Sequence, residues 1–142
     1  MISCLKLIVV ISGTVHASFK MNRVKRNRFT VFRNSYMAKY EPASYVVGVK
    51  GVQNVDITNN LFGDNEMDYE LLAGIKTSSI DNYVNAVENW WGTTSGKQIR
   101  HKIFDFDDWN SYAIANFEPF YTSDRFDSSL SQDYESTPAS SK

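Results

Sequence analysis

The sequence lacks the residues from which several common kinds of site are built. It has one cysteine, Cys4, and two histidines, His16 and His101. An internal disulfide therefore cannot form, and a zinc site of the usual Cys/His type cannot be assembled. The sequence also has no Asn-X-Ser/Thr acceptor, so glycosylation gives no indication of secretion. Cysteine usage leaves the redox compartment undetermined.

An excess of charge of one sign is missing as well. Lys and Arg number 15 against 16 Asp and Glu, for a net charge of −1. This balance argues against a dedicated nucleic-acid binder or a polybasic membrane module. The basic run at residues 20–29 is interpreted as a solvated face. The sequence has no apolar run of the ~20 residues needed to cross a bilayer, so no membrane span is expected in this chain.

Aromatic residues, by contrast, are plentiful. The 142 residues are 42% hydrophobic and 14% aromatic, which suits one domain with a packed core. The stretch VENWWGTT at 87–94 contains two adjacent tryptophans, Trp90 and Trp91. Neighbours in a strand point to opposite faces, so the two indole rings need two different apolar surroundings, or one and a ligand.

The apolar run near the N-terminus, LIVVIS at 7–12, has two interpretations. It could be the core of a signal peptide cleaved after Ala17, but the segment before it lacks charge apart from the interrupting Lys6. Its β-branched residues favour a buried strand instead. In that case Val9 and Ile11 should lie in parallel register beside Val47 and Val49, in a fragment of a longer extracellular protein.

Short strings recur along the chain and indicate a repeat. VKRNRF, ITNNLF and AVENWW each place an asparagine two residues before an aromatic ring, at Asn27 and Phe29, Asn60 and Phe62, and Asn89 and Trp91. A second pair, VVGVKG at 46–51 and LAGIKT at 72–77, aligns Gly48 with Gly74. The separations are about two to three dozen residues, a period typical of solenoids.

Each unit reads as strands and turns. Val47, Val49, Val55 and Ile57 alternate along the chain, and glycine and asparagine separate the runs. The sequence therefore predicts an all-β fold, a right-handed parallel β-helix of few coils over residues 1–121. Residues 95–121 are expected to form a short C-terminal helix and cap, and 122–142 a linker or disordered tail. The alternative is an antiparallel sandwich, which would separate Asn60 from Asn89.

The asparagines and aromatics are expected to be structural. Asparagine tolerates the left-handed conformation of sharp turns, and stacked asparagines can bond one another as a ladder. The rings two residues later would then form an inward column of Phe29, Phe62 and Trp91. Trp90, equivalent to Leu61, would face the other way under the C-terminal segment; the functional alternative is an exposed Trp90 that stacks on sugars.

Asn89, Trp90, Trp91 and Gly92 together resemble the end signature of right-handed parallel β-helix regions of the pectate-lyase-like kind. More narrowly, YVVGVKG, MDYELLAG and IFDFDDWN resemble the bark beetle (anakonda)-like family of tricellular-junction proteins. The resemblance covers about residues 20–135. It implies a piece of a large single-span membrane protein, extracellular, which helps seal the corners where three epithelial cells meet. Its partners would be proteins or glycans at the cell surface.

The carboxylates argue against catalysis. Glycoside cleavage needs two carboxylates about 5–10 Å apart, which a solenoid would supply from equivalent positions of stacked coils. The repeat places Asn85, not an acid, opposite Asp56. We therefore expect a non-catalytic scaffold or interaction segment without a cofactor. The alternative is a carbohydrate-binding or carbohydrate-active secreted β-helix protein.

Two other candidate groups carry little chemistry. Asp105 and Asp107 could share a strand face and hold calcium through oxygen ligands, although no EF-hand spacing accompanies them; the alternative is a solvated acidic rim. His101 has no nucleophile motif nearby. Ile99 and Ile103 are spaced for one helical face, which leaves His101 directed toward solvent.

Overall fold

The computed structural model describes residues 6–12, 16–28, 42, 44–50, 54–74 and 83–124, and these residues form mostly short strands. One helix, α1 (Gly96–Arg100), accompanies them. The strands are β1 (Lys6–Ser12), β2 (His16–Lys20), β3 (Arg23–Lys25), β4 (Ser44–Lys50), β5 (Asn54–Thr58), β6 (Leu61–Gly63), β7 (Tyr69–Leu72), β8 (Tyr83–Asn85), β9 (Ile103–Phe104) and β10 (Ile114–Asn116). The all-β prediction is confirmed.

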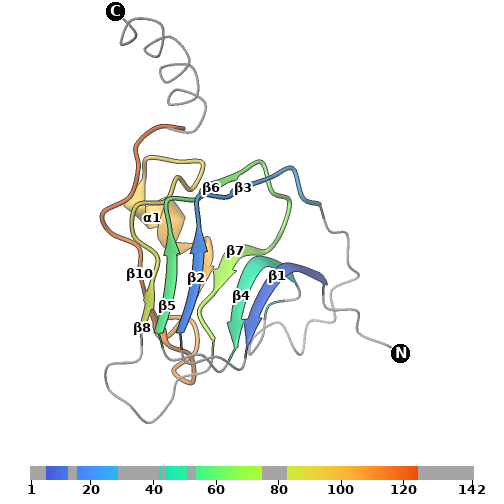
Figure 1. Cartoon of the computed structure of the whole chain (residues 1–142), viewed down its shortest axis with the longest axis vertical. Helices are drawn as coiled ribbons and strands as arrows, with labels where there is room; N and C mark the ends of the chain where they lie inside the picture. Colours follow the sequence, from blue (N-terminus) through green and yellow to red (C-terminus); the bar gives the residue numbers. More distant parts are fainter. Residues whose placement is uncertain are drawn as a thin grey trace, which may run out of the picture.

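Every strand pairing in the described ranges is parallel. The first sheet has the order β1-β4-β7-β9, the second β10-β8-β5-β2, and the third joins β3 to β6. Successive strands along the chain thus pass from one sheet to the next, and each such set of consecutive strands forms one layer. Strands at equivalent positions of neighbouring layers lie side by side within a sheet (Figure 1). Leu61 and Trp90 also form a parallel bridge, so the antiparallel alternative is wrong.

The N-terminal apolar run is a strand in the predicted register. In β1, Val9 pairs with Val47 of β4, and Ile11 pairs with Val49. Val9 and Ile11 also pack against the core as partly buried side chains. The run therefore contributes apolar side chains to the first layer, as its β-branched composition predicts.

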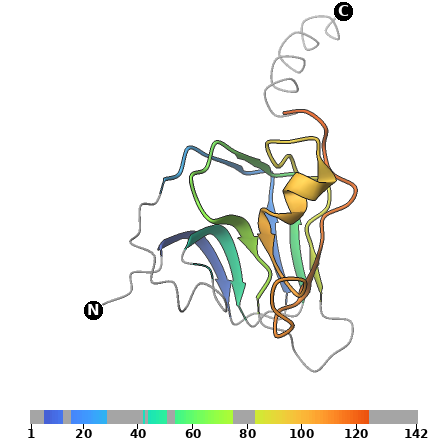
Figure 2. The same ribbon diagram turned by 180° about the vertical axis from the view of Figure 1, so that it is seen from behind.

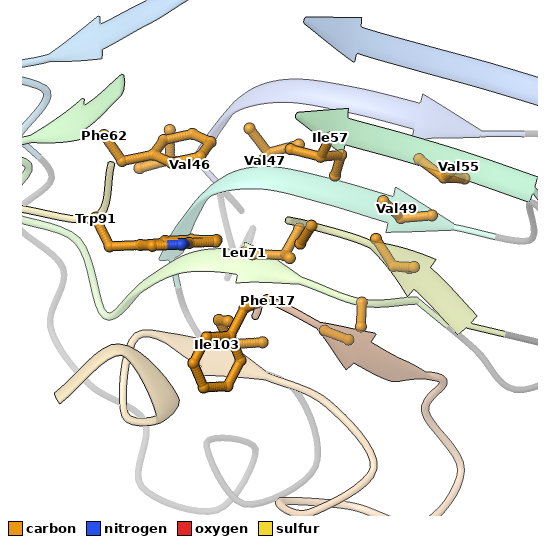
Figure 3. Packing of buried hydrophobic residues seen from close by; sticks show 14 of the residues in the cluster. Val46, Val47, Val49, Val55, Ile57, Phe62, Leu71, Trp91, Ile103 and Phe117 are labelled. Carbon is orange, nitrogen blue, oxygen red and sulfur yellow. The ribbon is translucent and has the colours of Figure 1, made fainter. Parts of the chain in front are cut away.

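The main core lies between the first and second sheets. Val47 from β4, Ile57 from β5 and Ile103 from β9 are fully buried in one cluster. Figure 3 shows these side chains pointing from their strands into the same interior space. Parallel strands covered on their inner face need apolar side chains from each layer, which the alternating valines and isoleucines provide.

A second apolar cluster, which we call the aromatic cover, lies on the opposite face of the first sheet. Neighbouring residues of a strand point to opposite faces, so Leu72 leaves the core that Leu71 enters. The cover consists of Tyr45, Leu72, Phe104 and Tyr112, with Tyr69 and Trp109 packed against them. The Phe104 ring makes edge contacts with the Tyr69 and Tyr112 rings, at centroid distances of 5.2 and 5.1 Å.

The predicted alignment of Gly48 with Gly74 is wrong by two residues. Gly48 pairs with Leu72, and the Tyr45 ring lies where a side chain at position 48 would project. Gly74 follows β7 with φ +80°, and a Cβ there would lie 2.2 Å from the Val49 carbonyl oxygen. The two glycines thus have different roles. Gly48 leaves space for the Tyr45 ring, and Gly74 adopts the positive φ of a turn.

The helix α1 lies within the stretch where the sequence predicts one. Ser95 is its N-cap and accepts a hydrogen bond from the Gln98 backbone N–H. Ile99 is fully buried, whereas His101 at the C-cap is exposed. The back view shows α1 as the yellow-orange helix beside the strands (Figure 2). His101 thus lies on the surface as expected, but the single helical face predicted for Ile99 and Ile103 is wrong, because Ile103 lies in β9.

Candidate functional site

Three buried or partly buried asparagines form a continuous stack at one corner of the fold. The Asn22 backbone N–H donates to Asn60 Oδ1 at 3.0 Å, and the Asn60 N–H donates to Asn89 Oδ1 at 2.8 Å. The Asn89 Nδ2 group donates to the Ile57 and Ala86 carbonyl oxygens. Each layer is thereby bonded to the next through an amide side chain, which satisfies main-chain groups where the strands turn.

Asn27 does not occupy the position that the sequence alignment assigns to it. The first member of the stack is Asn22, because β3 pairs with β6 so that Val24 lies opposite Phe62. The inward partner of Phe62 in the first layer is therefore valine. Phe29, assigned to that place, lies outside the described residues. The spacing Asn22-X-Val24 held the right signal, but the aromatic criterion selected the wrong asparagine.

Asn27 instead begins a second stack. Its backbone N–H donates to Asn65 Oδ1 at 3.0 Å, and its own Nδ2 donates to the same oxygen at 2.9 Å. Asn65 Nδ2 in turn donates to Glu70 Oε2 at 2.9 Å. A carboxyl group thus ends this stack, where an amide ends the first one.

Glu70 is an interior carboxyl that sequence reasoning did not identify. Its neighbours Tyr69 and Leu71 pair with Tyr45 and Val47, which places Glu70 in register with the fully buried Val46. Only 4% of Glu70 is exposed. Burial raises its pKa to about 7, although the hydrogen bond from Asn65 and the charge of Lys102 act in the opposite direction.

The two adjacent tryptophans lie in different environments. Trp91 is fully buried and stacks on Phe62, with ring centroids 5.0 Å apart and planes 26° apart; Figure 3 shows the two rings one above the other. Trp90 is partly buried, and its backbone N–H donates to the Asn60 carbonyl oxygen. Gly92 follows with φ +79°, which a glycine adopts without strain. The partial burial of Trp90 gives no support to an exposed sugar-stacking ring.

The calcium candidates lie in a turn, because β9 ends at Phe104, and the prediction of a shared strand face is wrong. Asp105 is 1% exposed, so it is not part of a solvated rim. Its carboxylate accepts from Arg100 Nη1 at 2.8 Å, the Ala115 N–H at 3.0 Å and the Asp107 N–H at 3.1 Å. Asp107 is mostly exposed, 3.5 Å from Arg100. Within the described ranges, no cluster of three His, Cys, Asp or Glu side chains could hold a metal.

A shallow groove on the outward face of the second sheet is the candidate site. We define this outer groove by two adjoining depressions, of about 270 and about 580 Å³, which share Tyr83 and Asn85. The first is also lined by His16, Ala17, Ser18, Asn54, Val55 and Asp56, and the second by Val87, Arg100, Ala115, Asn116, Phe117 and Glu118.

A row of polar side chains crosses this groove. In register, Ser18 pairs with Asp56, Asp56 with Asn85, and Asn85 with Asn116. Asn85 Nδ2 donates to Asp56 Oδ1 at 2.9 Å, and Lys20 Nζ lies 3.4 Å from Asp56 Oδ2. The predicted pairing of Asp56 with Asn85 is confirmed. Asp56 therefore has no second carboxylate at the equivalent position of either adjacent strand.

Comparison with known proteins gives one match. The chain is 40% identical over 132 residues to Protein bark beetle of Drosophila melanogaster, an alignment that covers 85% of this chain. The chain is bark beetle-like. The same alignment spans 4% of the length of that relative, so the bark beetle-like chain corresponds to a short segment of it. No protein-family model and no solved structure matches the chain.

Within the described residues of the chain, no helix has the length and apolar character needed to cross a membrane.

Proposed function

We propose that this chain is a right-handed parallel β-helix segment in the extracellular part of a junctional membrane protein, where it acts as a non-catalytic scaffold. The observation that carries this proposal is the bark beetle-like sequence over 85% of the chain. In this proposal the segment helps to seal the corners where epithelial cells meet, and its partners are proteins or glycans of the cell surface.

The layered strands support the β-helix. Three parallel sheets receive consecutive strands in turn, β1-β2-β3 and then β4-β5-β6, before the order repeats in part with β7 and β8. Asparagine side chains bond one layer to the next at two corners. A right-handed crossover is the usual hand for parallel strands connected in this way.

The outer groove supports a non-catalytic role. Glycoside cleavage uses two carboxylates that flank the scissile bond. Beside Asp56 the adjacent strands present Ser18 and Asn85 in register, and Asp56 is itself bonded to Asn85 and Lys20. The other carboxylate of the groove, Glu118, lines the second depression and not the first. Asp105 is buried, and its carboxylate accepts hydrogen bonds from three donors, so it stabilises the fold.

Localisation in an epithelium that expresses the protein tests the proposal. An antibody against the chain should label the corners where three cells meet, and deletion of residues 6–121 from the expressed protein should raise paracellular passage of a fluorescent dextran. Uniform labelling of the cell interior, together with an unchanged barrier, would contradict the junctional role.

A second candidate is a carbohydrate-binding or carbohydrate-active secreted protein, which is favoured by the half-exposed Tyr83 and Ile114 beside the polar row. Incubation of the chain with a panel of polysaccharides tests this candidate. Turnover that disappears in Asp56→Asn would favour an enzyme over the scaffold.

A further inference from the structure

The outward face of the second sheet, which carries the outer groove, combines an apolar ledge with the polar row. Tyr83 and Ile114 pair across β8 and β10, and they are 49% and 50% exposed. Two residues further along the same strands, Asn85 pairs with Asn116. Side chains two residues apart share a face, so the ledge and the polar row lie side by side. We propose that the outer groove binds a neutral glycan, an inference that rests on the proposed scaffold function and names its partner.

The position of the groove argues against a peptide. An extended peptide gains its affinity by pairing with the main chain at an exposed sheet edge. The groove instead crosses β5 and β8, each of which already has a paired strand on both sides. Their main-chain N–H and C=O groups are already used in hydrogen bonds to the neighbouring strands. A ligand on this face must therefore be recognised through side chains.

The charges of the groove argue against an acidic ligand. Lys20 lies 3.4 Å from Asp56, and Arg100 is bonded to the buried Asp105 at 2.8 Å. These two cations are thus engaged by carboxylates of the protein. Asp56 and Glu118 add negative charge to the lining. A sulfated or carboxylated glycan would meet repulsion there, whereas a neutral one would not.

The remaining side chains match the chemistry of a sugar. Side-chain amides donate and accept at once, the Ser18 hydroxyl does the same, and the Asp56 carboxylate accepts. Hydroxyl groups along one edge of a pyranose ring need this mixture. The C–H face of the ring is apolar and can pack on Tyr83, as ligand sites commonly combine apolar walls with a few placed polar groups. Adjacent strands lie about 4.7–4.9 Å apart, close to the length of one hexose unit in an extended chain.

A glycan array probed with the full chain tests the inference. The array should carry neutral oligosaccharides of hexoses and N-acetylhexosamines beside sulfated and uronic-acid oligosaccharides, with a peptide array in parallel. The neutral oligosaccharide that binds best is then titrated against variants. Tyr83→Ala and Asn85→Ala should each weaken binding about tenfold or more. Matched exposed residues outside the groove, Phe106→Ala and Asn110→Ala, should leave it unchanged.

The outcomes separate this inference from the scaffold proposal. Binding of only acidic glycans, binding of only peptides, no binding, or equal binding by the groove variants and the controls would each overturn it. Melting curves establish that the variants are folded, and Asn85→Gln provides a second, milder variant if Asn85→Ala is unstable. If Asn85→Ala loses the glycan but still reaches cell corners, the scaffold proposal stands independently; junctional targeting that fails while the glycan still binds overturns the scaffold alone.

Discussion

The two outward sheet faces of this protein share one framework and differ in what covers them. The first sheet carries the aromatic cover, in which Tyr45 and Leu72 are fully buried and Phe104 is 3% exposed. The second sheet carries the outer groove, in which Tyr83 is 49% exposed beside a polar row. Both faces are built from parallel strands in register. Side-chain pattern, and not the framework, therefore determines that one face is covered and the other is open to solvent.

The chain itself supplies the aromatic cover. Residues after β9 turn back over the first sheet, held by the Asp105 carboxylate and by the Ala113 N–H, which donates to the Gly74 carbonyl. Tyr112 then contacts the Phe104 ring. Apolar area removed from water in this way stabilises by roughly 25 cal/mol per Å². On the second sheet the polar row consists of Ser18, Asp56, Asn85 and Asn116, and these side chains have less apolar area to remove from water.

The largest expected contrast is between one aromatic from each face. Phe104→Ala should lower the free energy of unfolding by about 3–5 kcal/mol, because it leaves a cavity among packed rings. Tyr83→Ala should change it by only about 0.5 kcal/mol. Denaturant unfolding of both variants measures the contrast. A loss below about 1 kcal/mol for Phe104→Ala would place that ring outside a packed cluster.

The next contrast concerns two carboxyl groups, Glu70 in the interior and Asp56 on the outward face of the second sheet, which we call the open face. Glu70 has a pKa of about 7 in the fold, above its ordinary value of 4.5. The folded state therefore holds its proton more tightly, and the associated stability is present below pH 4.5 and is lost as pH rises through about 7. This loss amounts to about 3 kcal/mol.

Glu70→Gln should remove that part of the pH dependence and leave the variant more stable than the parent near pH 8. Asp56→Asn, on the open face, is the matched control and should leave the difference between low and high pH in place. Unfolding curves at pH 4.5, 6 and 8 provide the measurement. Parallel pH profiles for Glu70→Gln and the parent would show that Glu70 does not titrate in this range.

Amide side chains offer a third contrast. Asn89 is fully buried and bonded to two carbonyl groups, whereas Asn116 is exposed. Asn89→Ala should destabilise the fold by about 1–3 kcal/mol, because it leaves main-chain groups unsatisfied. Asn116→Ala should cost about 0.5 kcal/mol or less. Equal effects of the two substitutions, measured by thermal unfolding, would remove the distinction between the stack and the groove.

The smallest expected effect belongs to the ion pair of the open face. Lys20 and Asp56 are each 47% exposed at the side chain, so solvent screens their attraction. Lys20→Ala should change the free energy of unfolding by about 1 kcal/mol or less, with a smaller effect at high salt. A larger loss that persists in 1 M salt would mean that the open face contributes to stability after all.

The sequence predicts the layered β framework well because its signal is local and periodic. The alternation of Val47, Val49, Val55 and Ile57 marks strands, and the run at 7–12 supplies their first-layer partner. The equivalence of Asp56 and Asn85 follows from the repeat offset, since the connection between them preserves register.

The register of the first layer, the alignment of the two glycines and the burial of Glu70 could not be predicted from the sequence in the same way. Asn22 and Asn27 both precede an apolar side chain, and only the pairing of β3 with β6 selects Asn22. The gap between Gly48 and Gly74 hides a shift of two residues, because each glycine answers to a different local contact. Glu70 shows no sequence signal for burial, since its environment is made by Asn65 and by the neighbouring layers.

The strands β2, β5, β8 and β10 form one continuous parallel face with the polar row across it. Isotope-labelled NMR of the full chain tests this claim directly through nuclear Overhauser contacts between adjacent strands. We expect parallel-type contacts that join Ser18 to Asp56, Asp56 to Asn85, and Asn85 to Asn116. Antiparallel contact patterns, or contacts that place Asp56 and Asn116 on neighbouring strands with Asn85 elsewhere, would contradict it.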